Sequence, residues 1–434
     1  MEKILKNRKL LLIVASAIAL IIVVSLIAVI ASKGGNGTKK DNKTPQQKDG
    51  SRADKIMDIF MNPDGRMLCV SKQGDTASFP ENSYEGIKSA IKKGADIIEI
   101  NISRTSDGYL VLIKDEDFSR MCVDPEGNTI DSKVSETESW EVIGMCLRQG
   151  RGGNAKEPTE CHPQTLEGIL QAFGKKAVFL LDFDEELLDE VYNEVEKLGS
   201  LNRVIFKLDS SSGTVKKFLE AHREENLAVM GEYDGNIVFS ARSYTKDMIK
   251  YGAKATLLSV KNANGVIFHG SVLDLYDGKI RAAIDVTSPE KCGEREDDET
   301  GWNDLASRGY SVIATDYPDR LSSFIELTEQ EKAALSDLVE KTEALNKKDY
   351  SEPSYKRLKK EIDTSKQLLE SQTSKKALNE QYYKLNSAYE ALDAKGENEG
   401  VTVSLGRIIA IVFAVALFVF AQWTVYKHSS KRKD

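Results

Sequence analysis

Most of the chain alternates short apolar runs with longer segments of helical periodicity. From residue 66 onward the runs are apolar on both faces, which is typical of parallel strands covered by helices. Strands are predicted at 67–71, 97–101, 109–114, 178–182 and 204–208, and helices at 84–93, 165–173, 185–198 and 212–224. Further strand-like runs lie at 227–233, 236–241, 255–260, 265–270, 281–286 and 311–316. These exceed what eight strands need, so some belong to insertions. The pattern predicts an α/β fold, a (β/α)8 TIM barrel.

Residues 328–394 have a purely helical pattern instead. Apolar positions fall on one face of three successive segments, with breaks at Pro353 and at residues 371–374. Thr328 and Glu331 have capping-box spacing, so the first of these helices is expected to begin there. The segment predicts a C-terminal three-helix bundle.

Two long uncharged runs lie near the ends of the chain, at 10–31 and 408–426. Each is long enough to cross a hydrocarbon core of about 30 Å as a helix. A cleaved signal peptide would have a shorter apolar region, of about 7 to 15 residues. Lysines and arginines in residues 1–9 and 427–434 predict two transmembrane helices with both termini cytoplasmic. The expectation is a two-span plasma-membrane protein whose central domains are extracellular.

The central residues divide into four predicted parts. A flexible linker at 32–65 is rich in Gly, Asn, Lys and Asp in its first half, and the barrel follows at 66–326. The helical bundle occupies 328–394, and a short acidic linker occupies 395–407.

Charge and cysteine content exclude some classes of protein. The formal net charge is -8, which argues against a nucleic-acid partner. None of the five cysteines forms a CxxC pair, which excludes a zinc knuckle or a thioredoxin-like centre. One disulfide is expected among Cys122, Cys146 and Cys161, and the pairing stays open, Cys292 included.

Charged and polar side chains follow the predicted strands, where the reactive groups of a parallel barrel lie. They are Lys72, Glu99, Asn101, Lys114, Asp182 and Asp184. Opposite charges are therefore expected around one mouth. One interpretation is a network of ion pairs that only closes the end of the barrel.

Six stretches of the chain form an ordered set of motifs: residues 72–74, 79–83, 94–101 and 107–116 near the start, then 163–167 and 315–321. Together these stretches resemble a glycerophosphodiester phosphodiesterase domain. The resemblance covers about residues 66 to 326 and implies a TIM barrel of the phosphodiesterase type. It also implies a ligand-binding role for Lys72, Gln73, Glu81, Lys114 and Asp184.

The sequence departs from this family at the reactive positions. Lys72 and Lys114 stand at the two catalytic histidine positions. Among the family's metal-binding positions Glu99 and Asp182 keep a carboxylate, whereas Asn101 replaces an aspartate. A lysine of pKa about 10.4 is charged at neutral pH and is a poor general base. We expect a lysine ammonium to replace the metal by pairing with Glu99 and Asp182, so that no cofactor is needed.

These departures favour a non-catalytic role. The leading interpretation is a binding or scaffold module for an anionic, glycerol-phosphate-like envelope or cell-wall ligand, or for a protein partner. The alternative is an active phosphodiesterase of lipid or teichoic-acid metabolism, which would need Ca²⁺ or Mg²⁺. A third interpretation is a rigid structural element without a ligand.

The C-terminal helices resemble a FIVAR module, through residues 345–351 and 382–392. The resemblance implies a spacer or a polymer-contacting module beside the barrel.

Overall fold

The structure of the protein is a computed structural model, which describes residues 50–208, 212–235, 237–259, 265, 268, 270–370 and 374–394. The two predicted spans, 10–31 and 408–426, lie outside the described residues, as do the predicted terminal segments and residues 395–407. No helix within the described ranges is both long and apolar enough to cross a membrane. On this finding we correct the predicted location, a two-span plasma-membrane protein with extracellular central domains.

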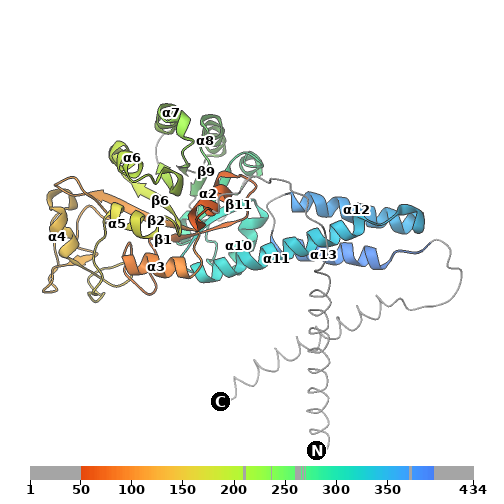
Figure 1. The fold of residues 1–434 in the computed structure, drawn as a ribbon, viewed down its shortest axis with the longest axis horizontal. Helices are drawn as coiled ribbons and strands as arrows, with labels where there is room; N and C mark the ends of the chain where they lie inside the picture. Colours follow the sequence, from red (N-terminus) through yellow and green to blue (C-terminus); the bar gives the residue numbers. More distant parts are fainter. Residues whose placement is uncertain are drawn as a thin grey trace, which may run out of the picture. The chain divides into compact units, whose positions relative to one another are not determined.

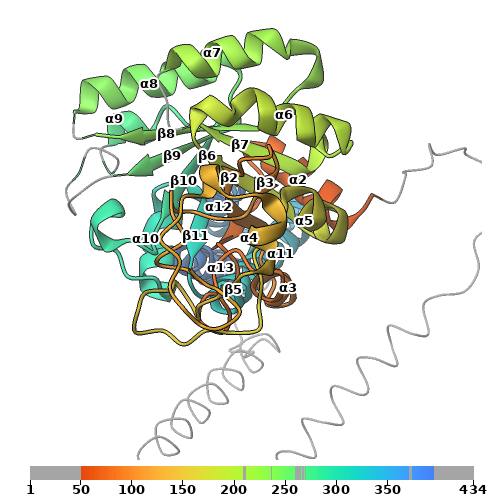
Figure 2. The same cartoon turned by 90° about the vertical axis from the view of Figure 1, so that its left-hand side faces the viewer.

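Eight parallel strands form a closed barrel (Figures 1 and 2). In chain order they are β1 (Leu68–Lys72), β2 (Ile97–Arg104), β6 (Val178–Phe183), β7 (Val204–Leu208), β8 (Val229–Asp234), β9 (Ala255–Ser259), β10 (Arg281–Asp285) and β11 (Tyr310–Thr315). Each pairs with the next, and β11 pairs with β1, where Leu68 lies opposite Val312. The predicted TIM barrel is confirmed.

Two predicted strands within the described residues are not barrel strands, and a third, 265–270, lies partly outside the described residues. Of residues 109–114 only β3 (Leu110–Val111) is a strand, and it pairs antiparallel with the far end of β2. Residues 238–241 of the run 236–241 belong to a helix, α8 (Val238–Tyr251), whose buried positions Ala241, Thr245 and Met248 repeat with helical spacing. A run of six residues is too short to show the helical period of the whole element, so it was predicted as a strand. Val178–Phe183 is therefore the third barrel strand, not the fourth.

Helices cover the outside of the barrel and bury its outer apolar face. They are α3 (Tyr84–Lys92), α5 (Leu166–Phe173), α6 (Leu188–Lys197), α7 (Ser212–Ala221), α8, α9 (Gly270–Leu273), α10 (Glu299–Ser307) and the first half of α11 (Pro318–Glu343). Short 3-10 turns lie at Val134–Glu136, Glu185–Leu187, Leu201–Arg203, Arg223–Glu225, Pro289–Lys291 and Lys347–Asp349. Ser83 and Thr165 cap α3 and α5, each accepting a backbone N–H bond at 3.0 Å.

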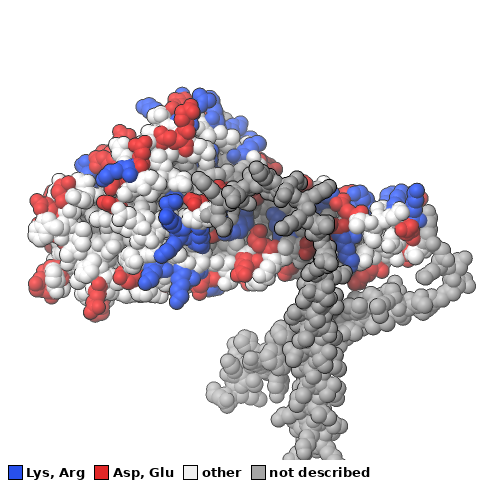
Figure 3. Space-filling view, in the orientation of Figure 1, with Lys and Arg blue, Asp and Glu red and all other residues white. Residues whose placement is uncertain are grey.

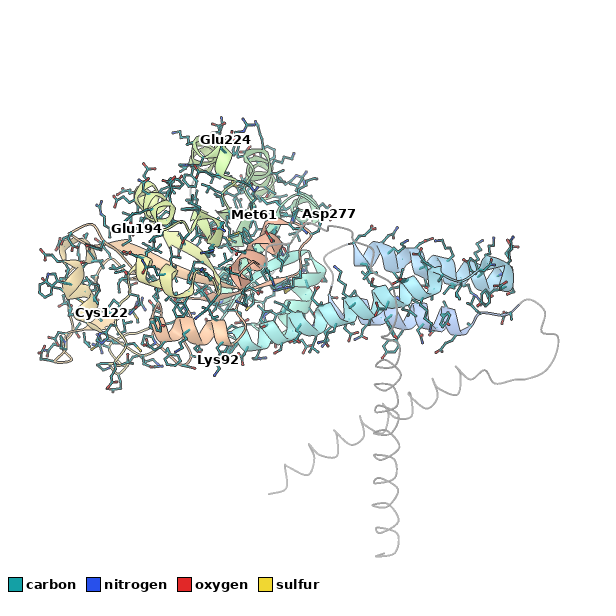
Figure 4. The ribbon with its side chains drawn as sticks, in the orientation of Figure 1. Met61, Lys92, Cys122, Glu194, Glu224 and Asp277 are labelled. Carbon is teal, nitrogen blue, oxygen red and sulfur yellow. The ribbon has the colours of Figure 1, made fainter. Side chains whose placement is uncertain are left out.

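An inserted segment between β3 and α5 has an apolar core of its own. It contains β4 (Cys122–Val123), β5 (Cys146–Leu147) and α4 (Ser139–Gly144), and it lies in front of the strands in Figure 2. Cys122, labelled in Figure 4, is buried in this core. All five cysteines are described and all are thiols, so the predicted disulfide is wrong. Cys122 lies opposite Leu147 and Cys146 opposite Val123, which places the two thiols on opposite faces of the ladder.

The predicted linker 32–65 contains a helix, α2 (Arg52–Met61), which begins at a capping box of Ser51 and Asp54. Its buried side chains are Ala53, Ile56, Met57 and Phe60, and they pack against the inward-facing side chains of the barrel. Arg52 donates to the carbonyl of Lys176 at 2.6 Å, just before β6. Helix α2 therefore closes the amino end of the barrel.

Arg281, the first residue of β10, holds the segment that follows α2. Its side chain is 1% exposed and donates to the carbonyl oxygens of Ile59, Asn62, Gly65, Arg66 and Ser311. These carbonyls would otherwise be buried without partners. One arginine thus joins the closing segment to two neighbouring strands.

The C-terminal bundle consists of α11, α12 (Glu352–Leu369) and α13 (Lys375–Glu390), around a core that includes Leu335, Leu358 and Leu385. Its first helix does not begin at Thr328 as predicted, because α11 is continuous from the barrel. The Thr328 hydroxyl donates to the carbonyl of Phe324 at 2.8 Å, within the helix. The expected boundary between 326 and 328 is therefore the middle of a helix.

We predict that Arg281→Met lowers the free energy of unfolding by about 3 kcal/mol or more, because several buried carbonyls lose their donor at once. The matched control is Arg104→Met, which removes an exposed ion pair with Glu190 and is expected to cost about 0.5 kcal/mol or less. Urea unfolding of both variants measures the difference. Equal losses would contradict the role given to Arg281.

Candidate functional site

The polar residues at the carboxyl ends of the strands come together at the barrel mouth. They are Lys72 of β1, Glu99 and Asn101 of β2, Asp182 of β6, Lys207 of β7, Glu232 of β8 and Asp285 of β10. The register places Lys72 opposite Glu99 and Asn101 opposite Asp182. Each residue stands near the end of an apolar run, where the barrel interior gives way to solvent.

Lys207 bridges two carboxylates of the mouth. Its Nζ lies 3.1 Å from Asp182 Oδ1 and 3.1 Å from Glu232 Oε2, and its side chain is 11% exposed. Burial acts to lower the pKa of Lys207, but Glu99, Asp182 and Glu232 together raise it well above its ordinary value. The amine therefore stays protonated and cannot act as a base.

Lys72 forms a second buried ion pair, with Asp285. Burial opposes the pKa shift of both groups, yet Glu99 and Asp285 raise the pKa of Lys72, and Lys72 lowers that of Asp285. Burial raises the pKa of Glu99, against the attraction of Lys207 and Lys72. The expected pairing of a lysine with Asp182 thus exists, but Lys207 makes it, whereas Lys72 pairs with Asp285.

Asn101 lies at the centre of a hydrogen-bond network. Its Oδ1 accepts from Gln73 Nε2 at 2.6 Å and from Asn82 Nδ2 at 3.4 Å. Its Nδ2 donates to Asp182 Oδ2 at 2.7 Å. Both oxygens of Asp182 are therefore engaged, one by this amide and one by Lys207.

The side-chain oxygens of Asp182 and Asn101 are not arranged to bind a divalent ion. Ca²⁺ and Mg²⁺ need several oxygen ligands of net negative charge, but the oxygens of Asp182 and Asn101 already accept hydrogen bonds. The Lys207 ammonium is close enough to repel a second cation. Within the described ranges no three or more His, Cys, Asp or Glu side chains group as metal ligands.

Gln73 connects the barrel to the inserted segment. It is buried and has a positive φ of 63°, a backbone conformation that residues other than glycine rarely adopt. Backbone bonds hold it there, from its N–H to the Glu99 carbonyl and from the Asn82 N–H to its own carbonyl, each at 2.9 Å. Its Oε1 accepts from Arg151 at 2.9 Å, and Arg151 also pairs with Asp316 after β11.

Glu81 belongs to a second arginine contact. Arg120 of the inserted segment pairs with Glu81 and Asp115 and donates to the carbonyl of Arg151. Glu81 is 3% exposed, so its predicted place in a ligand site is filled by this ion pair. Arg120 and Arg151 together fasten the inserted segment over the mouth.

Lys114 and Asp184 are exposed and stand apart from this network. Lys114 follows the short antiparallel β3, which pairs with the far end of β2, rather than a barrel strand as predicted. Asp184 precedes the turn Glu185–Leu187, one residue beyond the end of β6.

Six residues at the mouth were not predicted from the sequence: Arg120, Arg151, Lys207, Glu232, Asp285 and Asp316. Lys207 and Asp285 had a usable signal, because each lies in the last two positions of its strand, as Asp182 does. Arg151 had none, because its partners Gln73 and Asp316 are remote in the chain.

Comparisons with known proteins agree on one family. Residues 73–255 match the model of the glycerophosphoryl diester phosphodiesterase family. A glycerophosphodiester phosphodiesterase of Caldanaerobacter subterraneus is 40% identical over 77 residues, 18% of this chain and 31% of that one. One of Bacillus subtilis is 28% identical over 130 residues, 28% of this chain and 41% of that one. The chain thus spans less than half the length of either relative.

A solved structure supports the fold. A glycerophosphoryl diester phosphodiesterase from Parabacteroides distasonis has a TM-score of 0.50 at 18% sequence identity, and covers 62% of this chain and 90% of its own. At that identity the likeness concerns the fold alone.

We predict opposite pH dependences for Glu99→Gln and Asp285→Asn. The pKa of Glu99 is raised in the folded state, so the wild type loses stability as the pH rises above 4.5, and Glu99→Gln gains relative to it. The pKa of Asp285 is lowered, so Asp285→Asn loses stability above pH 3.8, and this loss fades as the pH falls through the lowered pKa. Urea unfolding from acid to neutral pH tests both. Slopes of the same sign would contradict the assignment.

Proposed function

The chain carries a domain of the glycerophosphoryl diester phosphodiesterase family, and we propose that this barrel is a non-catalytic member that binds a polyhydroxylated ligand at its mouth. The observation that supports this most is the Lys207 ammonium between Asp182 and Glu232. It supplies from within the chain a positive charge of the kind that a metal ion would bring.

Neither of the two family histidine positions, Lys72 and Lys114, carries an imidazole that could act as general base on a phosphate diester. Lys72 stands at a histidine position, is paired with Asp285, and has a raised pKa, so it holds its proton at neutral pH. Lys114, at the other histidine position, is exposed on the inserted segment. Without a proton acceptor at the Lys72 position, the activation of water there has no evident base.

Charge balance favours a neutral ligand over an anionic one. The described mouth residues include four cations, each paired with at least one carboxylate: Lys72, Arg120, Arg151 and Lys207. The acidic side chains there outnumber them: Glu81, Glu99, Asp115, Asp182, Glu232, Asp285 and Asp316. A phosphate would meet an excess of negative charge. Hydroxyl groups, which both donate and accept, suit partly exposed side chains such as Asp182 and Arg151. We therefore favour a glycerol or sugar moiety over the glycerol-phosphate-like ligand expected from the sequence.

The bundle is proposed to act as a spacer. Helix α11 runs without interruption from the barrel into the bundle, and Lys375 at the start of α13 lies 3.4 Å from Glu299 of α10. A shared helix leaves no hinge at that junction, which suits the spacer role that the FIVAR resemblance implies.

We predict that Ca²⁺ and Mg²⁺ leave the melting temperature of the wild type unchanged, because Lys207 holds the acidic groups. Lys207→Met removes that charge, so the same ions are expected to raise its melting temperature by mass action. Lys197→Met, an exposed lysine paired with Glu194, is the matched control and should gain no ion response. Ion-dependent stabilisation of the wild type, or hydrolysis of glycerophosphocholine abolished by Glu99→Gln, would establish the enzyme alternative instead.

We predict that isothermal titration of the full chain detects binding of glycerol or a hexose and gives no heat with inorganic phosphate. Asp182→Asn is expected to weaken the binding of the polyol. The reason for the difference between the probes is the excess of carboxylates at the mouth. Phosphate binding stronger than polyol binding would contradict the charge argument, and no binding of any probe would favour the purely structural role.

A further inference from the structure

Helix α4 of the inserted segment presents two different faces. Ser139 and Val142 are buried and point toward the core of the segment. Trp140 and Ile143 are also three residues apart, and their side chains are 68% and 43% exposed. The outward face is therefore apolar at the positions where a surface helix usually carries polar residues.

A neighbouring hairpin extends this apolar face. Asp107 accepts bonds from the Ser139 N–H at 3.0 Å and from the Ser139 hydroxyl at 2.7 Å, and the Ser106 N–H donates to the Thr137 carbonyl at 3.0 Å. These bonds fix the hairpin beside the start of α4. The hairpin carries Tyr109, which is 54% exposed.

The surroundings of this face are acidic. Exposed carboxylates between β4 and β5 are Glu126, Asp131, Glu136, Glu138 and Glu141. Lys133, the one basic residue in that stretch, pairs with Glu116. The Trp140 indole donates to Glu138 Oε2 at 2.6 Å, so a carboxylate lies at the edge of the ring. In Figure 3 the end of the molecule that carries α4 is mainly uncharged with acidic atoms at its edges.

We propose that Tyr109, Glu138, Trp140, Glu141 and Ile143 form a docking surface, the acidic aromatic face, for a lysine- or arginine-rich polypeptide segment. Cations bind both aromatic faces and carboxylates, and their aliphatic stems cover apolar side chains such as Ile143. The charge of the surface repels nucleic acid. Because Trp140 is so exposed, the surface suits an extended chain better than a small molecule, which needs a concave site.

The proposal concerns a surface outside the barrel mouth, so it stands independently of the proposed function. Neither the barrel core nor the core of the inserted segment uses the side chains of Trp140 and Ile143. The Ser139 and Asp107 bonds hold α4 in place whether or not a partner is present.

The test is binding of a dye-labelled synthetic peptide that alternates lysine and leucine, measured by fluorescence anisotropy with the full chain. Wild type is expected to bind it, with affinity that falls as salt rises. Trp140→Ala is expected to bind about fivefold more weakly through the lost cation–π contact, and Glu138→Gln with Glu141→Gln is expected to weaken binding also.

The matched control is Glu194→Gln with Glu224→Gln, which removes the same charge from the helical side of the barrel (Figure 4). It should bind the peptide as the wild type does. An equal loss in this control, undiminished binding by Trp140→Ala, or no binding by the wild type would overturn the proposal. So would self-association in sedimentation that Trp140→Ala abolishes, because the occupant would then be a second copy of the chain.

Discussion

The mouth of the barrel depends on the Lys207 ammonium. Asp182, Glu232 and Asp285 approach from strands that the barrel geometry forces together, and with Glu99 they would repel one another without a cation. Lys207 compensates Asp182 and Glu232 directly, and Lys72 compensates Asp285. Glu99, deeper and fully enclosed, is left with burial as the main influence on its pKa, which rises. Thus the site contains carboxylates paired directly with a lysine and one buried carboxyl group, Glu99, whose pKa is raised.

The two ends of the barrel are closed by different means. At the amino end, helix α2 covers the interior and Arg281 satisfies the carbonyls of the chain that returns to β1. At the carboxyl end, Arg120 and Arg151 fasten an inserted segment by contacts with side chains of the mouth. The amino end is closed mainly by apolar contacts of α2, next to the buried Arg281 guanidinium. The carboxyl end is closed by partly exposed ion pairs, which salt and water weaken more easily.

The sequence was most informative where a pattern is local. Eight of the predicted strand positions, such as 178–182 and 204–208, correspond to barrel strands, because a short apolar run between turns is typical of a buried strand. Helix α2 was not predicted. Its apolar residues directly follow a long polar stretch, and the sequence pattern does not separate the two, so both fell within the predicted linker 32–65. The site was predicted only in part. Asp182 and Asn101 were located correctly, but their partner Lys207 belongs to another strand, and the distance between strand ends is a property of the closed barrel.

A lysine differs from a divalent ion in ways that affect the whole site. Its charge is single and its stem is covalently fixed, so it compensates Asp182 and Glu232 but leaves less charge to hold Glu99 ionised. Lys207 pairs with Asp182 and Glu232, and the Asn101 side-chain oxygen accepts from Gln73 and Asn82 instead. The Gln73 side chain, whose amide group donates to Asn101, also accepts from Arg151 of the inserted segment. The contacts of the mouth therefore form one continuous network, from Lys207 and Asp182 at the strand ends through Asn101 and Gln73 to Arg151 of the inserted segment.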